Sequence, residues 1–269
     1  MDDRPIGVFD SGVGGLTVLR ALHEQLPGES TVYLGDTARL PYGTKSPEVV
    51  TRYALGAGRF LAERGIKALV VACNTASAFS LPALEKALDV PVLGVVEPGA
   101  RAAVAAPRNR GRIGVIGTPG TIKSGAYQSA LARLAPELQV EARACPLFVP
   151  LAEEGWTEGE VARLVAREYL THLAETGVDS LVLGCTHYPL LKSVIAEVMG
   201  DGTRLVDSAE ATAGAVHDLF ASRDLLGSSR AAPEHAYFVT DLPDRFAAVG
   251  SRFLGRPIEG AELVDIAPA

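Results

Sequence analysis

The feature that most constrains the fold of this chain is a short apolar run that ends in a cysteine, and the sequence contains it twice. The first copy runs from Ala68 to Cys73 and the second from Ser180 to Cys185. A short, continuously apolar run is typical of a strand buried on both faces, as strands of parallel sheets are. Polar residues and a helical pattern follow each cysteine. Each copy therefore predicts a buried parallel strand that delivers a cysteine into a strand-to-helix turn.

The rest of the pattern alternates between strands and helices, which is typical of the α/β class. Further strands are predicted at residues 6–9, 31–34, 91–96, 112–116, 138–144, 204–206, 237–240 and 263–266. Helices are predicted at residues 16–26, 47–64, 77–88, 158–175, 211–220 and 244–254, with two more that end near residues 134 and 199. A polar, basic stretch at residues 107–111 separates two similar series of elements.

The two series resemble an internal duplication, because three landmarks recur at a nearly constant offset. Residues 6–8 recur at 113–115, Cys73 recurs at Cys185, and residues 95–97 align with 205–207. We therefore expect two pseudo-symmetric domains, each a mostly parallel sheet flanked by helices, with the active site in the cleft between them. The first domain is expected to comprise residues 1–97 plus 210–269, and the second residues 98–209. A chance series of strand–helix pairs is the alternative.

The composition and the N-terminus argue against several classes of protein. Hydrophobic residues make up 48% of the chain, which is enough for a sizeable core. The net charge of −7 argues against a general nucleic-acid or anionic-membrane surface. No apolar run approaches the roughly 20 residues that span a bilayer, and residues 1–4 lack the basic-then-apolar pattern of a secretory signal. We expect a cytoplasmic protein.

The three cysteines, Cys73, Cys145 and Cys185, are too few and too far apart to suggest a disulfide scaffold. A free cysteine is most often a small buried hydrophobe, and Cys145, which Pro-Leu-Phe follows, is expected to be one. Cys73 and Cys185 are followed by polar residues that fit poorly in a core. Each precedes a predicted helix, and helix N-termini stabilise a thiolate and bind carboxylates. These two cysteines are therefore the candidates for chemistry.

Polar residues gather at the predicted strand ends, where open parallel sheets bind their ligands. They are Asp10, Ser11, Asp36, Cys73, Asn74, Thr75, Cys185, Thr186 and His187. If the two halves face each other, these residues line one cleft with a thiol on each side. Two acid–base groups that face each other across a bound carbon can remove a proton from one face and return one to the other, which inverts a stereocentre. The substrate then needs an acidic C–H beside a carboxylate, which describes an amino acid.

The site must also set the protonation state of its thiols. An unperturbed thiol has a pKa of about 8.5, so only a few per cent of it is ionised at pH 7.

Four runs carry a more specific resemblance. They are FDSGVGGL at 9–16, GDTARLPYG at 35–43, ACNTA at 72–76 and GCTHYP at 184–189. In this order, and over nearly the whole chain, they resemble the glutamate racemases, which are cofactor-independent members of the aspartate/glutamate racemase family. The resemblance implies an isomerase that interconverts L- and D-glutamate by a two-base reaction and supplies D-glutamate for peptidoglycan and hence for cell-wall biogenesis and cell shape.

The resemblance also assigns residues. It implies that Cys185 serves the L-enantiomer and Cys73 the D-enantiomer. Further residues would hold the substrate or support the thiols: Asp10, Ser11, Tyr42, Gly43, Asn74, Thr75, Thr186 and His187. The family has an acidic helper before the second cysteine, for which Glu153 and Glu154 are both candidates, and we favour Glu153. The implied partner is glutamate, without nucleic acid or membrane, and the oligomeric state stays open between a monomer and a homodimer.

Several of these residues have a structural role to set beside the functional one. Asp10 can orient the substrate ammonium or assist a thiol, and it can also cap the following helix. Asp36 has the same alternatives, with the cap favoured. His187 is expected to tune or protonate the second thiol. Thr121, like the other hydroxyls at helix starts, can cap the helix, bind a carboxylate, or do both.

Three alternatives for the function stay open. Within the racemases, aspartate is the other candidate substrate. Cys73, Cys185 and His187 also form a Cys₂His set, which is a known zinc arrangement when a fourth position is open. A non-catalytic amino-acid sensor with two domains would present a similar cleft.

Overall fold

The computed structural model describes residues 1–106, 111–229 and 231–267, which form two parallel sheets. The strands of the first sheet are β1 Ile6–Asp10, β2 Thr31–Gly35, β3 Ala68–Val71, β4 Val92–Gly94, β9 His235–Val239 and β10 Glu262–Leu263. Those of the second are β5 Arg112–Gly117, β6 Gln139–Ala144, β7 Ser180–Gly184 and β8 Arg204–Asp207. Each strand pairing among the described residues is parallel.

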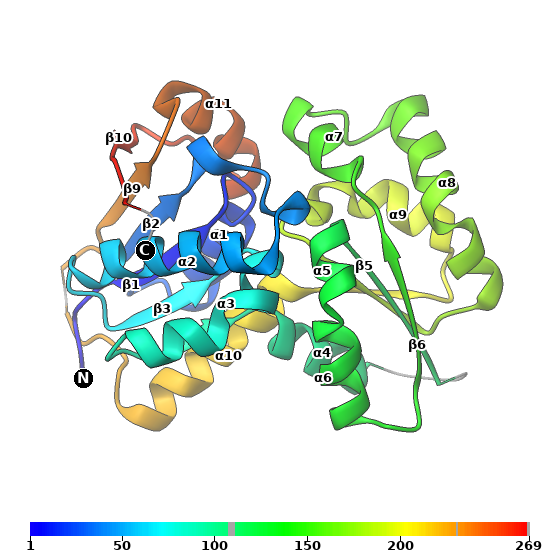
Figure 1. Cartoon of the computed structure of the whole chain (residues 1–269), viewed down its shortest axis with the longest axis horizontal. Helices are drawn as coiled ribbons and strands as arrows, with labels where there is room; N and C mark the ends of the chain where they lie inside the picture. The colour runs from blue at the N-terminus through cyan, green and yellow to red at the C-terminus, as the bar shows by residue number, and fades with distance from the viewer. Residues whose placement is uncertain (107–110, 230, 268–269) are drawn as a thin grey trace.

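Helices surround both sheets, and the sheets form two lobes that lie side by side (Figure 1). The α-helices are α1 Leu16–Gln25, α2 Pro47–Ala62, α3 Asn74–Ala87, α4 Val96–Ala105, α5 Pro119–Ser124, α6 Ala126–Leu134, α7 Phe148–Glu154, α8 Gly159–Thr176, α9 Lys192–Met199, α10 Ser208–Arg223 and α11 Pro243–Leu254. Three 3₁₀ turns are η1 Thr37–Arg39, η2 Tyr42–Thr44 and η3 Tyr188–Leu191. The predicted α/β class with two parallel sheets is confirmed.

The two sheets repeat one topology. The order is β10-β9-β2-β1-β3-β4 in the first sheet and β6-β5-β7-β8 in the second. The four strands β2-β1-β3-β4 therefore correspond to β6-β5-β7-β8, and β9 and β10 extend the first sheet at the β2 edge. The register agrees as well, because Val8 pairs with Val70 in the first sheet and Val115 with Val182 in the second. The duplication that the sequence predicted is present in the strand order.

One of the three landmarks was aligned wrongly. The strand predicted at 91–96 ends at Gly94, and residue 96 already begins α4, whereas residues 205–207 lie inside β8. Strand pairing makes Leu93 the equivalent of Val206. Leu93 pairs with Val70 and Val206 pairs with Val182, and these two valines hold equivalent positions in the two sheets. The helix α4 was missed because Glu97-Pro98-Gly99 suggests a turn. Proline is tolerated in the first helical turn, where its missing N–H needs no partner.

Four predicted helices differ in their boundaries, one of which, predicted at 211–220, extends over Ser208–Arg223. The helix after the first cysteine begins at Asn74 rather than Ser77, which places Cys73 at its N-cap. The helix that ends near residue 134 is two helices, because Gly125 breaks it with φ 69°. No α-helix directly follows the second cysteine: a turn and η3 intervene before α9 begins at Lys192. The basic break at 107–111 lies, except for Gly111, outside the described residues.

The central strands are buried on both faces. In β1, β3 and β7 each residue is buried, which explains the continuous apolar runs of the sequence. The largest hydrophobic cluster joins residues of both halves, from Leu16 on α1 and Phe253 on α11 to Phe148 on α7. The two lobes therefore share apolar packing rather than meeting only through polar groups.

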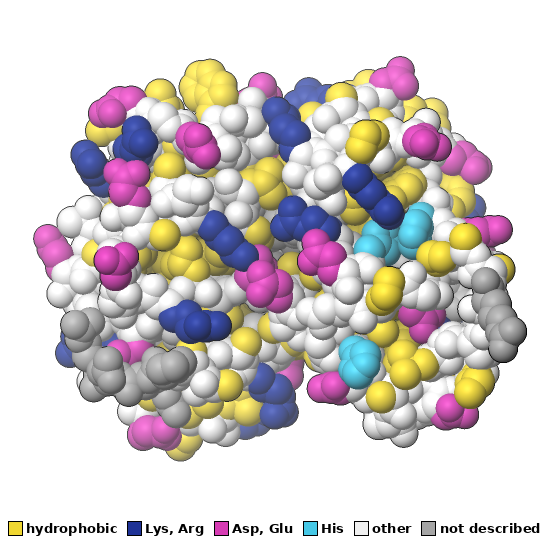
Figure 2. Space-filling model, turned by 180° about the vertical axis from the view of Figure 1, so that it is seen from behind, with side chains coloured by type: hydrophobic (Ala, Val, Ile, Leu, Met, Phe, Trp, Pro, Cys, Tyr) yellow, Lys and Arg dark blue, Asp and Glu magenta, His cyan; other side chains and the backbone are white. Residues whose placement is uncertain are grey.

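The expected domain boundaries fall at the starts of two helices. Residues 97 and 209 lie in the first turns of α4 and α10, and these helices pack against each other. The division into residues 1–97 plus 210–269 and residues 98–209 stays a prediction. The face in Figure 2 carries acidic and basic side chains interspersed, so this view offers no broad basic surface. Within the described residues, none of the helices combines the length and the apolar character needed to cross a membrane.

A buried ion pair holds the amino end of the first sheet. The Lys67 ammonium donates to Glu29 Oε2 at 2.5 Å and to the carbonyls of Asp2 and Leu225 at 2.7 and 2.8 Å. Glu29 Oε1 in turn accepts from the Gly227 N–H at 2.8 Å. The two charged side chains are 0% and 6% exposed. They join the N-terminus to the segment that follows α10, where the chain returns to the first sheet.

Replacement of Lys67 by methionine is expected to lower the free energy of unfolding by about 3–5 kcal/mol, because it leaves the Glu29 carboxylate buried without its counter-charge. Urea unfolding followed by circular dichroism measures the change. Arg163→Met is the control, since Arg163 pairs with Glu197 at 2.9 Å on the surface and its loss should cost less than about 1 kcal/mol. Equal losses in the two variants would contradict the prediction.

Candidate active site

The carboxyl ends of the two sheets meet at one cavity, and both candidate cysteines lie on its wall. The cavity is lined by Ser11, Pro41, Tyr42, Gly43, Cys73, Asn74, Thr75, Thr118, Val149, Cys185, Thr186 and His187. Each of the two cysteines is 6% exposed. Seven of the nine residues expected to bind substrate are therefore brought together, and Asp10 and Thr121 lie behind the wall.

Cys73 sits at the N-cap of α3, as its sequence context suggested. The Ala76 N–H donates to Cys73 Sγ at 3.5 Å, and Ser11 Oγ lies 3.5 Å from the same sulfur. Burial and the nearby charge of Asp10 nevertheless raise the pKa of the Cys73 thiol to about 12, since they outweigh these two hydrogen bonds. In this structure Cys73 is therefore a protonated thiol at neutral pH, and the helix N-terminus alone does not ionise it.

Cys185 lacks the helix N-terminus that the sequence predicted for it. Its polar neighbour is instead His187, whose Nδ1 lies 3.8 Å from Cys185 Sγ and whose Nε2 lies 3.0 Å from Glu153 Oε1. Burial disfavours the imidazolium, but the hydrogen bonds to Cys185 and Glu153 outweigh it and raise the pKa of His187 to about 10. A charged His187 can exchange a proton with Cys185. The two thiols are thus supported by different means.

Glu153, and not Glu154, contacts the histidine. Burial alone would raise the pKa of Glu153, but the hydrogen bond and charge of His187, together with Arg245, lower it. The Glu154 carboxylate is 66% exposed and lies 3.7 Å from Arg245. The main chain of Glu153 is also held, because Arg252 on α11 donates to its carbonyl.

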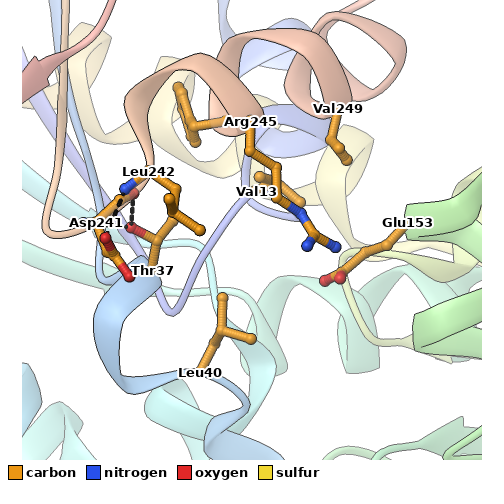
Figure 3. A pocket seen from close by; sticks show the side chains of 9 residues that line it. Val13, Thr37, Leu40, Glu153, Asp241, Leu242, Arg245 and Val249 are labelled. Atoms are coloured by element: carbon orange, nitrogen blue, oxygen red, sulfur yellow. Dashed lines mark hydrogen bonds between the residues drawn. The ribbon is translucent and has the colours of Figure 1, made fainter.

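A second pocket adjoins the outer side of Glu153 (Figure 3). It is lined by Val13, Thr37, Leu40, Glu153, Asp241, Leu242, Arg245, Phe246 and Val249. In Figure 3 the Arg245 side chain extends from α11 toward the Glu153 carboxylate. Glu153 therefore lies between the histidine of the cysteine site and an arginine of the other half.

Asp10 is a buried carboxylate behind the first thiol. It is 1% exposed, its Oδ2 accepts the Gly12 N–H at 2.8 Å, and its Oδ1 makes no hydrogen bond to the residues that the structure describes. Burial raises the pKa of Asp10. The helix-cap alternative is wrong for this residue, because Gly15 occupies the N-cap of α1. Asp10 instead acts on Cys73 through its charge.

The side chain of Asp36 binds the Tyr42 hydroxyl. Its Oδ2 accepts from the Tyr42 hydroxyl at 2.6 Å, and its Oδ1 accepts from Arg39 and Thr240, each at 2.8 Å. Asp36 is fully buried and does not line the cavity. Asp36 occupies the N-cap position of η1, as the favoured alternative predicted, but its side chain makes no capping hydrogen bond and instead fixes a cavity-wall tyrosine in place. A contact between Asp36 and the substrate ammonium stays a prediction.

Thr118 is the wall residue that the sequence interpretation missed. Thr75 Oγ1 lies 2.9 Å from Thr118 Oγ1 and 3.1 Å from Thr121 Oγ1. Thr121 is fully buried, whereas Thr118 lines the cavity and accepts the Thr121 N–H at 3.3 Å as the N-cap of α5. The available signal was its place directly after β5, at a strand end like the other candidates. Pro41 and Val149, which also line the cavity, carried no chemical signal.

Two glycines of the motifs allow the halves to approach closely. A Cβ at Gly14 would lie 2.2 Å from Thr186 Oγ1, and one at Gly43 would lie 2.6 Å from Thr118 Cβ. Real Cβ atoms do not approach so closely, so a larger residue would push the two walls of the cavity apart.

The described residues contain no cluster of three or more His, Cys, Asp and Glu side chains arranged to hold a metal ion. Cys73, Cys185 and His187, the set considered for zinc, are therefore not arranged as such a cluster. The arrangement that the structure does provide is a pair of thiols on one cavity, one beside a buried carboxylate and the other beside a histidine–glutamate pair.

Comparisons with known proteins show which proteins this chain is similar to. The sequence model of the Asp/Glu/hydantoin racemase family matches residues 6–216. A glutamate racemase of Geobacter metallireducens is 61% identical over 252 residues, covering 94% of this chain and 93% of the relative. The crystal structure of a glutamate racemase from Francisella tularensis in complex with D-glutamate superposes with a TM-score of 0.91 at 38% identity, covering 98% of each chain.

A further solved structure, a glutamate racemase from Thermus thermophilus in complex with β-chloro-D-alanine, has a TM-score of 0.89 at 47% identity, with 98% of each chain covered. An aspartate racemase of Picrophilus torridus has a TM-score of 0.55 at 18% identity, covering 82% of this chain and 94% of that chain. At that identity the similarity concerns the fold alone.

Replacement of Glu153 by glutamine is expected to lower the pKa of His187 by roughly one unit or more, because an adjacent carboxylate is one of the groups that raise it. Titration of the histidine ring signals by NMR measures the shift. Glu154→Gln is the matched control and should leave His187 unchanged, since Glu154 does not contact it. An unaltered pKa in Glu153→Gln would refute the role assigned to this carboxylate.

The raised pKa of His187 also predicts how stability depends on pH. The pKa is 6.5 for an ordinary histidine and about 10 here, so between these values the folded state holds a proton that the unfolded state lacks. The resulting stabilisation is complete below pH 6.5 and is lost as the pH rises through about 10. Denaturant unfolding from pH 6 to 10 should show a steeper loss in the wild type than in His187→Gln, and parallel curves would exclude this linkage.

Proposed function

Since the chain belongs to the Asp/Glu/hydantoin racemase family, we propose that it interconverts L- and D-glutamate, with Cys73 and Cys185 as the two acid–base groups. The observation that carries the proposal is the single cavity with both thiols on its wall. Reaction at an α-carbon that is held between two such groups changes its configuration without any group being transferred. The remaining cavity residues bind the substrate and support the thiols.

The proposed reaction needs one proton acceptor and one donor at a time. For L-glutamate, the Cys185 thiolate takes the α-hydrogen as a proton and leaves the electron pair on the α-carbon. The Cys73 thiol gives its proton to the opposite face, which produces D-glutamate and a Cys73 thiolate. The raised pKa of Cys73 supports its role as the initial donor. The D-to-L reaction exchanges the two roles, and His187 and Asp10 assist the return of the protons.

Hydrogen bonds hold the carboxylates of the substrate in this proposal. Among the described residues, the cavity wall carries no lysine or arginine, and its donors are hydroxyls, main-chain N–H groups and the Asn74 amide. Ser11, Thr75 and Thr186 supply hydroxyls on the cavity wall. These dipoles stabilise the developing carbanion most strongly when water is excluded from the cavity.

Glutamate is favoured over aspartate by the relatives. Proteins called glutamate racemases are 61% and 52% identical to this chain over nearly their whole length. An aspartate racemase is only 18% identical, and its similarity bears on the fold. We therefore assign glutamate as the substrate, and D-glutamate for peptidoglycan as the use of the product.

Other elements of the proposal follow from the chemistry. Both proton transfers are made by side chains, so the reaction is proposed to need no cofactor. The thiols must stay reduced, which fits a reducing compartment such as the cytoplasm. The homodimer stays a prediction.

The variants Cys73→Ser and Cys185→Ser are each expected to lower glutamate racemisation by at least roughly 100-fold, because a hydroxyl is a far weaker base than a thiolate. Cys145→Ser is the matched control and should retain activity, since Cys145 lies outside the cavity wall. Circular dichroism of each glutamate enantiomer follows the reaction, and NMR in deuterated water follows exchange of the α-hydrogen. Nearly wild-type racemisation in either variant would exclude the two-thiol reaction.

The same experiment separates the alternatives. Binding of glutamate without α-hydrogen exchange would identify a sensor, and loss of activity with a strong chelator would identify a metal enzyme. Because the two enantiomers are equally stable, a variant lowers kcat/KM equally in both directions. The assignment of each cysteine is therefore read from primary isotope effects: Cys185→Ser should enlarge the effect for 2-deuterated L-glutamate, and Cys73→Ser for the D-enantiomer.

A further inference from the structure

Tyr127 is a buried side chain of the second half that contacts Asn74, a residue of the first half on the cavity wall. It lies on α6, is 0% exposed, and donates its hydroxyl proton to Asn74 Oδ1 at 2.7 Å. Asn74 directly follows Cys73 and is 3% exposed on the cavity wall. The hydrogen bond therefore joins a helix beside the second sheet to the turn that carries the first thiol.

The other end of the same amide has no partner. Asn74 Nδ2 is buried and makes no hydrogen bond within the described part of the chain. A side-chain amide has one oxygen and one NH₂ group, so a phenol that donates to the oxygen decides which way the NH₂ group points. A buried donor without an acceptor is costly, and a carboxylate in the cavity would supply the acceptor.

The ring of Tyr127 also supports the turn of the second thiol. A Cβ at Gly184, the residue before Cys185, would lie 3.0 Å from Tyr127 Cε2, so the ring packs directly against this glycine. One side chain thus contacts the residue that follows Cys73 and the residue that precedes Cys185.

The other half has a matching contact. Thr17 on α1 donates to the carbonyl of Thr186, the residue after Cys185, at 3.0 Å. The two contacts have the same form. In each, a hydroxyl on a helix after the first strand of one sheet donates to the residue directly after the cysteine of the other half. The repetition of this contact across the pseudo-symmetric halves argues that it belongs to the construction of the site.

We propose that Tyr127 is a positioning residue for the racemase reaction, which holds the Asn74 amide so that its Nδ2 donor faces the cavity and binds a substrate carboxylate. This inference rests on the proposed function. Without the phenol proton, Asn74 can rotate and present its oxygen to the carboxylate, which would repel the substrate. Tyr127 therefore acts on substrate binding through Asn74, more than on the proton transfers themselves.

The first test is the variant Tyr127→Phe, which keeps the ring and removes the hydroxyl. We expect KM for both glutamate enantiomers to rise about tenfold, as for the weakening of a hydrogen bond to a charged group, while kcat changes much less. Tyr188→Phe is the control, because Tyr188 is equally buried and donates to the Cys145 carbonyl at 2.8 Å. It should lower the melting temperature by a similar amount and leave KM unchanged. An unaltered KM in Tyr127→Phe, or an equal rise in the control, would overturn the proposal.

A double-mutant cycle tests whether Tyr127 acts through Asn74. In the Asn74→Ala background, Tyr127→Phe should raise KM no further, because the amide that it positions is absent. Independent, multiplicative increases in KM would show that Tyr127 acts on binding by another route, and would refute the mechanism proposed here.

A measurement on the unaltered protein covers the case in which Tyr127→Phe does not fold. Asn74→Ala identifies the side-chain amide protons of Asn74 in the NMR spectrum, and these signals should shift when glutamate is added. Strong nuclear Overhauser contacts between these protons and the Tyr127 ring would instead mean that the NH₂ group faces the tyrosine, which would refute the proposed orientation. A wild-type protein that binds glutamate without racemising it would refute the proposed function, and leave the orientation to be decided by this spectrum.

Discussion

Parallel strand pairing is the constraint on which the rest of this structure depends. Because parallel strands all point the same way, their carboxyl ends and the turns that follow them gather at a single edge of each sheet. Here β1 pairs with β3, and β5 with β7, so Asp10 and Cys73 emerge together from one sheet and Thr118 and Cys185 from the other. The two edges face each other across one cavity. Two thiols that are far apart in the chain are thereby brought to one small space.

The two halves share a topology, but their thiols have different surroundings. Cys73 has a helix N-terminus and a buried carboxylate, and burial together with that carboxylate leaves it protonated. Cys185 has a turn and a 3₁₀ helix after it, and its partner is His187, whose pKa is raised by its hydrogen bonds to Cys185 and Glu153. Duplication therefore supplies two equivalent positions, while local groups give each position its own means of handling a proton. A reaction that runs in both directions needs both groups, each ready in turn to accept and to donate.

Contacts between the halves determine how closely the walls of the cavity approach. Glycines at 14 and 43 leave room for threonines of the other half, and the hydroxyls of Thr17 and Tyr127 each reach across to a cysteine turn. On the far side of His187, Arg252 of α11 donates to the Glu153 carbonyl. The Phe253 ring of the same helix packs against the histidine ring, with the two ring centroids 5.1 Å apart. The site is thus supported by packing and hydrogen bonds from both halves, and it belongs to neither half alone.

The sequence by itself determined the α/β class, the duplication and most of the cavity wall, because buried parallel strands leave continuous apolar runs and place polar residues directly after them. It was misleading where a local pattern has two physical outcomes: Glu97-Pro98-Gly99 suggested a turn but begins a helix, and the run after Cys185 suggested a helix but begins with a turn. Only the tertiary structure decided that Glu153 rather than Glu154 contacts His187, that Asp36 accepts from the Tyr42 hydroxyl, and that Tyr127 donates to Asn74. Those outcomes depend on which side chains meet once the chain is folded, and such contacts leave no periodic trace along the chain.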